Sequence, residues 1–183
     1  MNNMKPNLLI SLVLIVLIVV SRLLPHVWNV APVAAVALLA GAVLPKKWAV
    51  AIPLLGMLLS DWVIGFYRWP VMLAVYLSFA LIAIAGAALK KMKPVKLVVF
   101  SLASSTLFFL VTNFAVWAVG DWYPKTWAGL ALCYTWAIPF FRNTILGDLI
   151  FTGVLFGAYS LVQYIVKNKI FGQATVRLKQ FNN

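Results

Sequence analysis

The sequence contains very few of the residues from which catalytic and metal sites are built. Its 183 residues include three acidic residues, one histidine and one cysteine. A single cysteine, Cys133, excludes an internal disulfide. The lone histidine, His26, lies beside Pro25 with no nucleophile motif around it, so a Ser-His or Cys-His pair is not indicated. The HExxH motif, paired cysteines and a phosphate-binding glycine loop are also absent. The sequence therefore predicts that the protein is not an enzyme and holds no cofactor.

Charged residues are scarce as well, whereas apolar residues dominate. They make up 10% and 64% of the chain, and the mean hydropathy is +1.01. These values exclude an ordinary soluble domain and indicate an all-α integral membrane protein. The net charge of +12 does not require a nucleic-acid partner, because the basic residues cluster at the ends of apolar segments and set topology. We expect a multi-pass protein of the bacterial cytoplasmic (inner) membrane, with the lipid bilayer as its surroundings.

Apolar segments of membrane-spanning length occur along the whole chain. A spanning helix needs roughly 20 apolar residues. Five segments meet this requirement, namely 7–24, 48–66, 71–89, 97–119 and 143–166. The first follows Lys5 and has the look of a signal peptide, but no small-x-small cleavage site follows it, so we expect a retained helix. Two further segments, 27–44 and 126–139, are marginal in length.

The distribution of lysine and arginine indicates which of these two segments spans the membrane, because short cytoplasmic loops collect basic residues. If 27–44 spans the membrane and 126–139 does not, most basic residues share one side. Only Arg22, Arg68, Lys125 and Arg142 then lie outside. The sequence thus predicts one transmembrane domain, 1–183, with six helices and both termini in the cytoplasm. A short outer interfacial helix is expected at about 126–139, and a basic cytoplasmic tail at 167–183.

Two aspartates lie inside the predicted helices at matching depth. Asp61 lies five residues before the outer end of its helix, and Asp148 lies five residues after the outer start of its own. At 1.5 Å per residue, both are about 7 to 8 Å below the outer boundary. An ionisable residue at this depth indicates a functional site by default. The alternative is a structural ion pair of Asp61 or Asp148 with Arg22 or Arg142.

Tryptophan is distributed just as unevenly. Seven of the eight tryptophans fall on the predicted outer side, namely Trp28, Trp62, Trp69, Trp117, Trp122, Trp127 and Trp136. An aromatic belt at the membrane interface accounts for many of them. A belt should occupy both interfaces, so the bias also favours a second role, such as stacking walls for a flat ring system. The inner halves of the helices lack ionisable groups, which argues against an ion channel or a proton carrier.

The segment 126–148 holds several unusual residues close together. Its first part predicts a short outer helix that ends at Pro139, since proline removes a backbone donor. Asn143 or Thr144 is a suitable N-cap for the helix that follows. A lid over an outward cavity and a packed interfacial helix are both compatible with this pattern. Cys133 is either a soft metal ligand or an apolar filler, and filler is the favoured interpretation.

These segments resemble two known families. The stretch 29–65, NVAPVAAVALLAGAVLPKKWAVAIPLLGMLLSDWVIG, resembles the second and third helices of the substrate-binding S components of energy-coupling-factor (ECF) vitamin transporters. Across nearly the whole chain, RLLPH, SDWVIGFY, VYLSFALIA, TNFAVW, YPKTWAGL, PFFRNTILGD and FTGVLFG resemble an uncharacterised bacterial six-helix membrane-protein family placed near those S components. The second match is the more specific in sequence, and it carries no known substrate.

The S-component resemblance implies a six-helix S-component-like bundle that captures a vitamin-like small molecule at its outer face. The pocket it implies would be lined by Asp61, Trp62, Asn113, Trp117, Arg142 and Asp148, with Arg22 and His26 on the same side. It also implies an ECF-type transmembrane coupling subunit and ATPases as partners. Cobalamin is one candidate substrate, for which Cys133 would ligate cobalt.

The chain departs from the S components at the surface used for docking. Those proteins commonly carry an alanine-xxx-alanine patch on the first helix, and the first helix here has none. The nearest such spacing pairs Ala31 with Ala35, and Ala37 with Gly41, on the second helix. Small residues at this spacing let helices approach closely. Partner docking is therefore expected on the second helix, unless the protein acts alone.

Two functions of different class remain open. The first is a substrate-capture component of an uptake system, which predicts a cavity lined by Asp61, Trp117 and Asp148. The second is a non-transporting membrane subunit or scaffold that binds a protein or lipid through its outer face. The scaffold predicts that these residues are tightly paired without a cavity, beside an exposed apolar patch.

Overall fold

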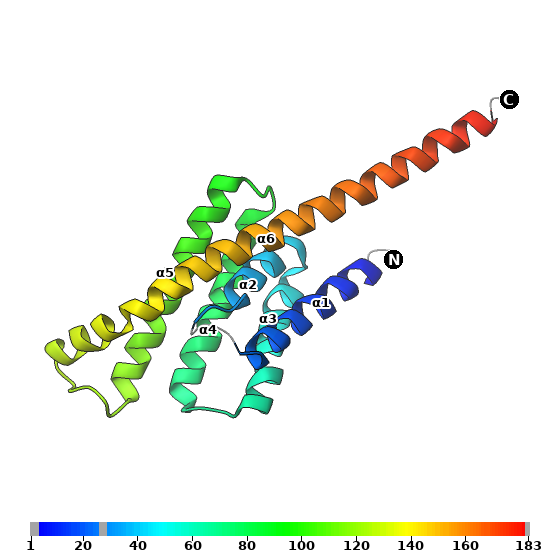
Figure 1. Ribbon diagram of the computed structural model, residues 1–183. Coiled ribbons are helices and arrows are strands. Elements are labelled where there is room, and N and C mark those ends of the chain that lie inside the picture. Colours follow the sequence, from blue (N-terminus) through cyan, green and yellow to red (C-terminus); the bar gives the residue numbers. More distant parts are fainter. Residues whose placement is uncertain (1–3, 26–28, 182–183) are drawn as a thin grey trace.

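Helices joined by short turns make up the structure. The computed structural model describes residues 4–25 and 29–181. Within these residues the elements are α1 (Met4–Leu23), α2 (Val33–Val43), α3 (Lys46–Ile64), α4 (Trp69–Gly86), the 3-10 helix η1 (Ala87–Leu89), α5 (Pro94–Val119) and α6 (Trp127–Phe181). No strand occurs in the described residues, so the all-α class predicted from composition is confirmed. The path of the chain is shown in Figure 1.

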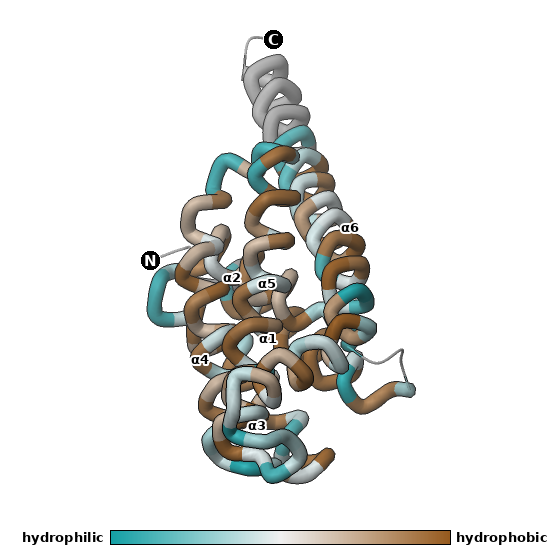
Figure 2. The backbone as a smooth tube through the Cα atoms, turned by 90° about the vertical axis from the view of Figure 1, so that its left-hand side faces the viewer, coloured by the Kyte–Doolittle hydropathy of each residue, from teal (hydrophilic) through white to brown (hydrophobic). Residues whose placement is uncertain are grey.

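Within the described residues, four helices are long and apolar enough to cross a membrane, namely α3, α4 continued by η1, α5 and α6. The apolar part of α1, 7–23, and α2 are shorter. Large apolar side chains such as Leu9, Leu73 and Val154 are exposed, as expected for helices that face lipid. Figure 2 shows hydrophobic residues along most of the helices and hydrophilic residues at several of the turns. These features indicate a membrane protein.

The two ends of the bundle can be distinguished by their turns. The loops 65–68 and 120–126 lie together, because the Arg68 guanidinium donates to the Asp121 carboxylate at 2.8 Å. We call this the predicted outer end. The lysine-rich turn 90–93 lies at the opposite end, where Met92 contacts Ser160 of α6. The N-terminal end of α1 and the C-terminal end of α6 point away from the loops 65–68 and 120–126 (Figure 1).

The helix α2 is the centre of the fold. From Val33 to Ala42 every side chain is buried, and α2 packs against α4, α3 and α6. A Cβ on Gly41 would lie 2.0 Å from the Ala83 carbonyl oxygen, and one on Gly86 would lie 2.3 Å from the Leu38 carbonyl oxygen. The backbones of α2 and α4 therefore touch, as glycine permits.

This packing places most of the small residues of the predicted docking surface inside the bundle. Ala35 and Ala37 are fully buried, and Gly41 is covered by α4. Ala31 is partly exposed, but it faces the cavity described below. The small residues on α2 allow close approach of helices, as their spacing predicts. The helix that approaches belongs to the same chain.

The last helix also differs from the prediction. A short helix over 126–139 and a separate one over 143–166 were expected, but α6 is continuous from Trp127 to Phe181 and contains Pro139. It begins where the Thr126 hydroxyl accepts a hydrogen bond from the Gly129 amide at 3.1 Å, which is the geometry of an N-cap. Thr144 is not a cap, since its hydroxyl donates to the Phe140 carbonyl within the helix. In apolar surroundings a broken helix would leave backbone groups without partners, so the chain tolerates the proline instead.

The predicted cytoplasmic tail is likewise part of a helix. Residues 167–181 continue α6, so the described part of the predicted tail is helical. With 55 residues, α6 is far longer than one bilayer crossing requires. Its last part extends beyond the rest of the bundle (Figure 1).

Candidate functional site

A cavity opens at the predicted outer end of the bundle, and all six α-helices or their adjoining loops contribute to it. Its volume is about 360 Å³. The polar residues that line it are Arg22, Asn29, Tyr67, Thr144 and Asp148. Apolar side chains, among them Met57, Phe79 and Phe108, form most of the remaining wall. This size and composition are typical of small-molecule sites, which are mainly apolar with a few polar groups.

The cavity exists partly because α2 is short. A helix was expected over 27–44, but it begins only at Val33, after Pro32. Eleven residues make a helix of about 16 Å, roughly half of the hydrocarbon thickness. Residues 29–32 before it form no regular helix, and Asn29 has a φ of 62°, a left-handed conformation that asparagine tolerates better than most residues. Irregular backbone at membrane depth is acceptable where it lines a cavity, and Asn29, Ala31, Val33 and Ala34 do so here.

Arg22, at the end of α1, is held by three groups of α3. Its guanidinium forms an ion pair with the Asp61 carboxylate at 2.6 Å and donates to the Ser60 hydroxyl at 2.6 Å and to the Met57 carbonyl at 3.2 Å. The second carboxylate oxygen of Asp61 accepts a hydrogen bond from the Tyr76 hydroxyl at 2.8 Å. Asp61 is only 1% exposed, and each of its carboxylate oxygens has a partner within the protein. The ion-pair interpretation therefore holds for Asp61.

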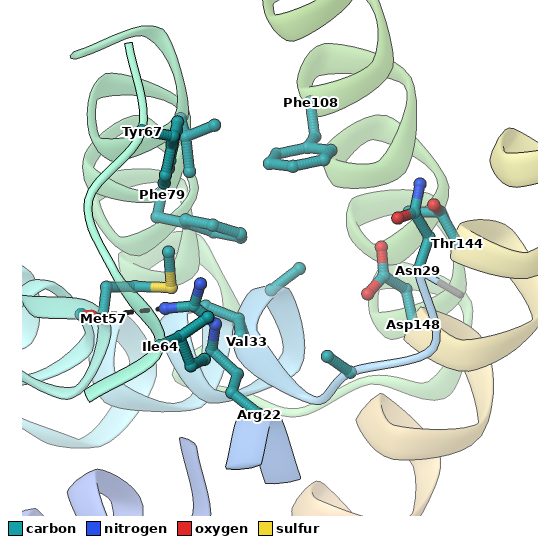
Figure 3. A pocket seen from close by; sticks show the side chains of 13 residues that line it. Arg22, Asn29, Val33, Met57, Ile64, Tyr67, Phe79, Phe108, Thr144 and Asp148 are labelled. Carbon is teal, nitrogen blue, oxygen red and sulfur yellow. Dashed lines mark hydrogen bonds between the residues drawn. The ribbon is translucent and has the colours of Figure 1, made fainter. Parts of the chain in front are cut away.

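Asp148, on α6, is in a different situation. It is 4% exposed, and its carboxylate lines the cavity. The Ser105 hydroxyl of α5 lies 2.6 Å from one carboxylate oxygen. Asp148 forms no ion pair within the part of the chain that the structure describes. Figure 3 shows Arg22 and Asp148 on opposite sides of the cavity, with Phe108 above the space between them.

Aromatic rings cover one wall of the cavity. The rings of Phe79 on α4 and Phe108 on α5 have centroids 5.1 Å apart and are tilted by 31°. Tyr67, from the loop 65–68, lies beside them (Figure 3). Burial and then the negative charge of Asp61 raise the pKa of Tyr67 to about 12, so its phenol is uncharged at physiological pH. The aromatic wall thus offers ring faces and one neutral hydroxyl.

A second cavity of about 320 Å³ adjoins the first. The two share Asn29, Phe108 and Thr144. The second cavity extends between α5 and α6 toward Asn113 and Phe141. The side chains of Asn29, Phe108 and Thr144 therefore lie between the two cavities.

The structure brings together some of the predicted site residues and separates others. Arg22 and Asp148 line the first cavity, and Asn113 lines the second. Asp61 lies behind Arg22 and supports it. Trp62 is 75% exposed, and Arg142 is exposed and lines neither cavity. His26 lies outside the described residues, as does Trp28.

Among the described residues no tryptophan lines either cavity, so the interpretation of tryptophans as stacking walls has no support in this part of the chain. Trp117 lines neither cavity, and its indole N–H donates to the Pro124 carbonyl at 2.9 Å. The side chains of Trp69, Trp122, Trp127 and Trp136 are more than half exposed. Exposure at the ends of apolar helices is the behaviour of an interfacial belt. The aromatic wall consists of phenylalanine and tyrosine instead.

Cys133 behaves as a filler. It is 2% exposed, its sulfur lies 3.6 Å from the Asn113 carbonyl oxygen, and it lines neither cavity. Among the described residues, no group of three or more His, Cys, Asp or Glu side chains could hold a metal ion. A cobalt ligand at this position has no support in the geometry.

Sequence reasoning missed several residues that line the cavity, chiefly Asn29, Tyr67, Phe79 and Phe108. The two phenylalanines occur in long apolar helices, where nothing in the sequence separates a cavity wall from a lipid-facing position. Asn29 had a usable signal, because an asparagine three residues before a proline at the start of an apolar segment indicates irregular backbone. Thr144 was considered only as a helix cap.

Comparison with known proteins places the chain in a family. Residues 2–171 match the model of DUF6580, described as a family of unknown function. Because this match covers most of the sequence, the chain belongs to that family. No curated protein and no solved structure gives a match. The cavity is therefore the main feature from which a function can be inferred.

Proposed function

We propose that the protein captures a small organic molecule in the cavity between Arg22 and Asp148. The observation that carries this proposal is a buried carboxylate, Asp148, that lines a cavity and has no cationic partner in the described residues. Burying an acid within a membrane bundle is costly, and one that faces a cavity without a cationic partner indicates a functional site. The enclosing helices provide apolar contact area, and the few polar groups provide orientation.

The more specific form of the proposal is an uptake component that resembles the ECF S components. The resemblance over 29–65 supports it, because residues near both ends of this stretch, Asn29 and Ile64, line the cavity. By the positive-inside rule, the loops 65–68 and 120–126 face outward, so the cavity would open to the outside of a bacterial cytoplasmic membrane crossed by six segments. A coupling subunit and ATPases would then supply the energy for release inward.

The scaffold alternative accounts for fewer observations. It requires paired carboxylates, and Asp61 is paired. It also requires that no cavity separates the polar residues, whereas about 360 Å³ lies beside Asp148. In the experiment below, the scaffold function would appear as a stable protein partner without a retained small molecule.

Native mass spectrometry of the gently purified full chain tests the proposal. We expect a retained small molecule in the wild type and its loss from Ala31→Phe, which places a ring into the cavity. The matched control is Ala118→Phe on the exposed side of α5, which should retain the molecule. If no small molecule is retained under any mild condition and a stable protein partner is found instead, substrate capture is wrong.

A further inference from the structure

The charges around the cavity do not balance. Among the described residues, one guanidinium, Arg22, and two carboxylates, Asp61 and Asp148, lie in or directly behind its wall. Arg22 is neutralised by Asp61 at 2.6 Å. Tyr67 contributes no charge, because its pKa is raised to about 12. With Asp148 ionised, the described part of the site therefore carries one negative charge that no described cation compensates.

The surroundings of Asp148 allow this charge to appear when a ligand arrives. The Ser105 hydroxyl lies 2.6 Å from Asp148 and 3.1 Å from the Ser101 carbonyl oxygen. If Asp148 is protonated, the acid can donate to Ser105, which then donates to Ser101. If Asp148 is ionised, the hydroxyl can rotate and donate to the carboxylate. Ser105 thus satisfies either state without movement of the helices.

The neighbouring polar groups do not replace a cation. Thr144 uses its hydroxyl to donate to the Phe140 carbonyl at 3.0 Å. The Arg22 guanidinium lies across the cavity and is engaged by α3 (Figure 3). The Asn29 amide is neutral. A ligand that contacts Asp148 therefore meets a carboxylate oxygen whose charge no protein cation in the described residues offsets.

The rest of the cavity selects for an apolar, preferably aromatic, body. Phe79 and Phe108 present adjoining rings, and Met57 and Val75 complete the apolar wall. The faces of aromatic rings attract cations as well as apolar groups. The apolar wall and the ring faces therefore favour a cation with an apolar body, as the Asp148 carboxylate does.

We propose that the molecule captured in this cavity is a small organic cation that carries an N–H donor, with its positive group at Asp148 and its apolar part against Phe79 and Phe108. This inference rests on the proposed capture function and gives its chemical class. Anionic molecules are disfavoured, since Arg22, the one guanidinium among the described lining residues, already has a carboxylate partner.

Three probes of one shape test the charge preference. Benzylammonium, benzyl alcohol and benzoate share a ring and differ in charge. Binding is measured by saturation-transfer NMR and by dissociation constants from NMR titration, with the full chain in lipid nanodiscs and empty nanodiscs as baseline. We expect benzylammonium to bind at least about tenfold more tightly than benzyl alcohol, as a charge-assisted hydrogen bond at a buried site predicts, and benzoate to bind most weakly.

Variants at the aspartates make the result specific. Asp148→Asn should remove the tenfold advantage of benzylammonium, and Asp148→Glu should keep the preference for the cation. Asp121→Asn, on the exposed loop 120–126, should leave all three affinities unchanged. Tight binding of benzoate or benzyl alcohol, equal to or above that of benzylammonium, would overturn the cation preference and leave substrate capture standing. If none of the three binds, the cation proposal fails; if native mass spectrometry also finds no retained molecule, the capture function fails with it.

Discussion

Asp61 and Asp148 are both aspartates within apolar helices, yet they have different bonding partners. Asp61 has a guanidinium on one oxygen and a phenol on the other. Asp148 has one serine hydroxyl and a cavity. Both are almost completely buried. Burial alone therefore does not distinguish the two aspartates; the difference is that Asp148 has no cationic partner in the described residues, and this is why we propose it as the binding residue.

The third aspartate completes the comparison. Asp121 is 82% exposed and pairs with Arg68 on the neighbouring loop. The chain contains no other acidic residue. One substitution, aspartate to asparagine, can thus be made at a buried paired site, a buried unpaired site and an exposed paired site. Unfolding by SDS in mixed micelles, followed by circular dichroism, measures the free energy of unfolding in each case.

The largest loss is expected for Asp61→Asn. The change leaves the Arg22 guanidinium, which is 18% exposed, without its counter-ion among α1 and α3. Breaking a buried ion pair in this way costs about 3 to 5 kcal/mol of unfolding free energy. A loss below about 1 kcal/mol, the usual value for exposed pairs, would show that Arg22 finds water or another partner.

A double variant separates the charge from the packing. In Arg22→Met with Asp61→Leu, both charged groups are replaced by apolar side chains. Because apolar replacement of a buried pair is often neutral, we expect most of the lost stability to return. If the double variant is as unstable as Asp61→Asn, the hydrogen bonds to Ser60 and Tyr76 contribute more than the ion pair does.

Tyr76→Phe should have the next largest effect. It removes the hydroxyl that donates to Asp61 at 2.8 Å and keeps the ring. A hydrogen bond to a charged group contributes about 1.5 to 3 kcal/mol, so we expect a loss in this range, measured by the same SDS titration. Tyr134→Phe is the matched control, because Tyr134 donates to a neutral carbonyl, that of Leu110, and should cost about 1 kcal/mol or less. Equal losses for the two variants would contradict the charged role of Asp61.

Asp148→Asn should change the stability by no more than about 1 kcal/mol, and in the direction of greater stability, since it removes an acid whose burial no cation offsets. The asparagine oxygen can still accept from Ser105. The same variant should abolish ligand retention in native mass spectrometry. A loss as large as that of Asp61→Asn would show that Asp148 has a structural partner and would remove the distinction between the two aspartates.

The sequence could predict these residues but not their roles. Apolar composition and helix length predicted the all-α class, and the cost of burying a charge identified Asp61 and Asp148 as special. Which of them Arg22 would reach depends on the angle at which α1 packs against α3, and no local pattern specifies it. The same limit applies to Phe79 and Phe108, whose neighbours in the sequence are equally apolar.

The errors at α2 and α6 have a common physical origin. Window-based reasoning takes helix ends from proline and from segment length, so it extended α2 back to 27 and divided α6 at Pro139. In the structure, the apolar surroundings preserve the long helix through its proline, whereas irregular backbone persists at Asn29 because it borders a cavity. The sequence predicted a cavity at this end of the bundle but not which backbone segments border it, so the local signals alone placed both boundaries wrongly.

The smallest effect is expected for Asp121→Asn. Its pair with Arg68 at 2.8 Å is as short as many buried contacts, but the two side chains are 82% and 58% exposed. Exposed ion pairs contribute about 0 to 1 kcal/mol because water solvates both partners and salt screens them. Arg68 also donates to the Val119 carbonyl, so the loops 65–68 and 120–126 remain joined without the carboxylate. We expect a loss of less than about 0.5 kcal/mol that decreases further at high salt. A loss near that of Asp61→Asn would mean that contact distance, and not burial, sets the value of an aspartate in this protein.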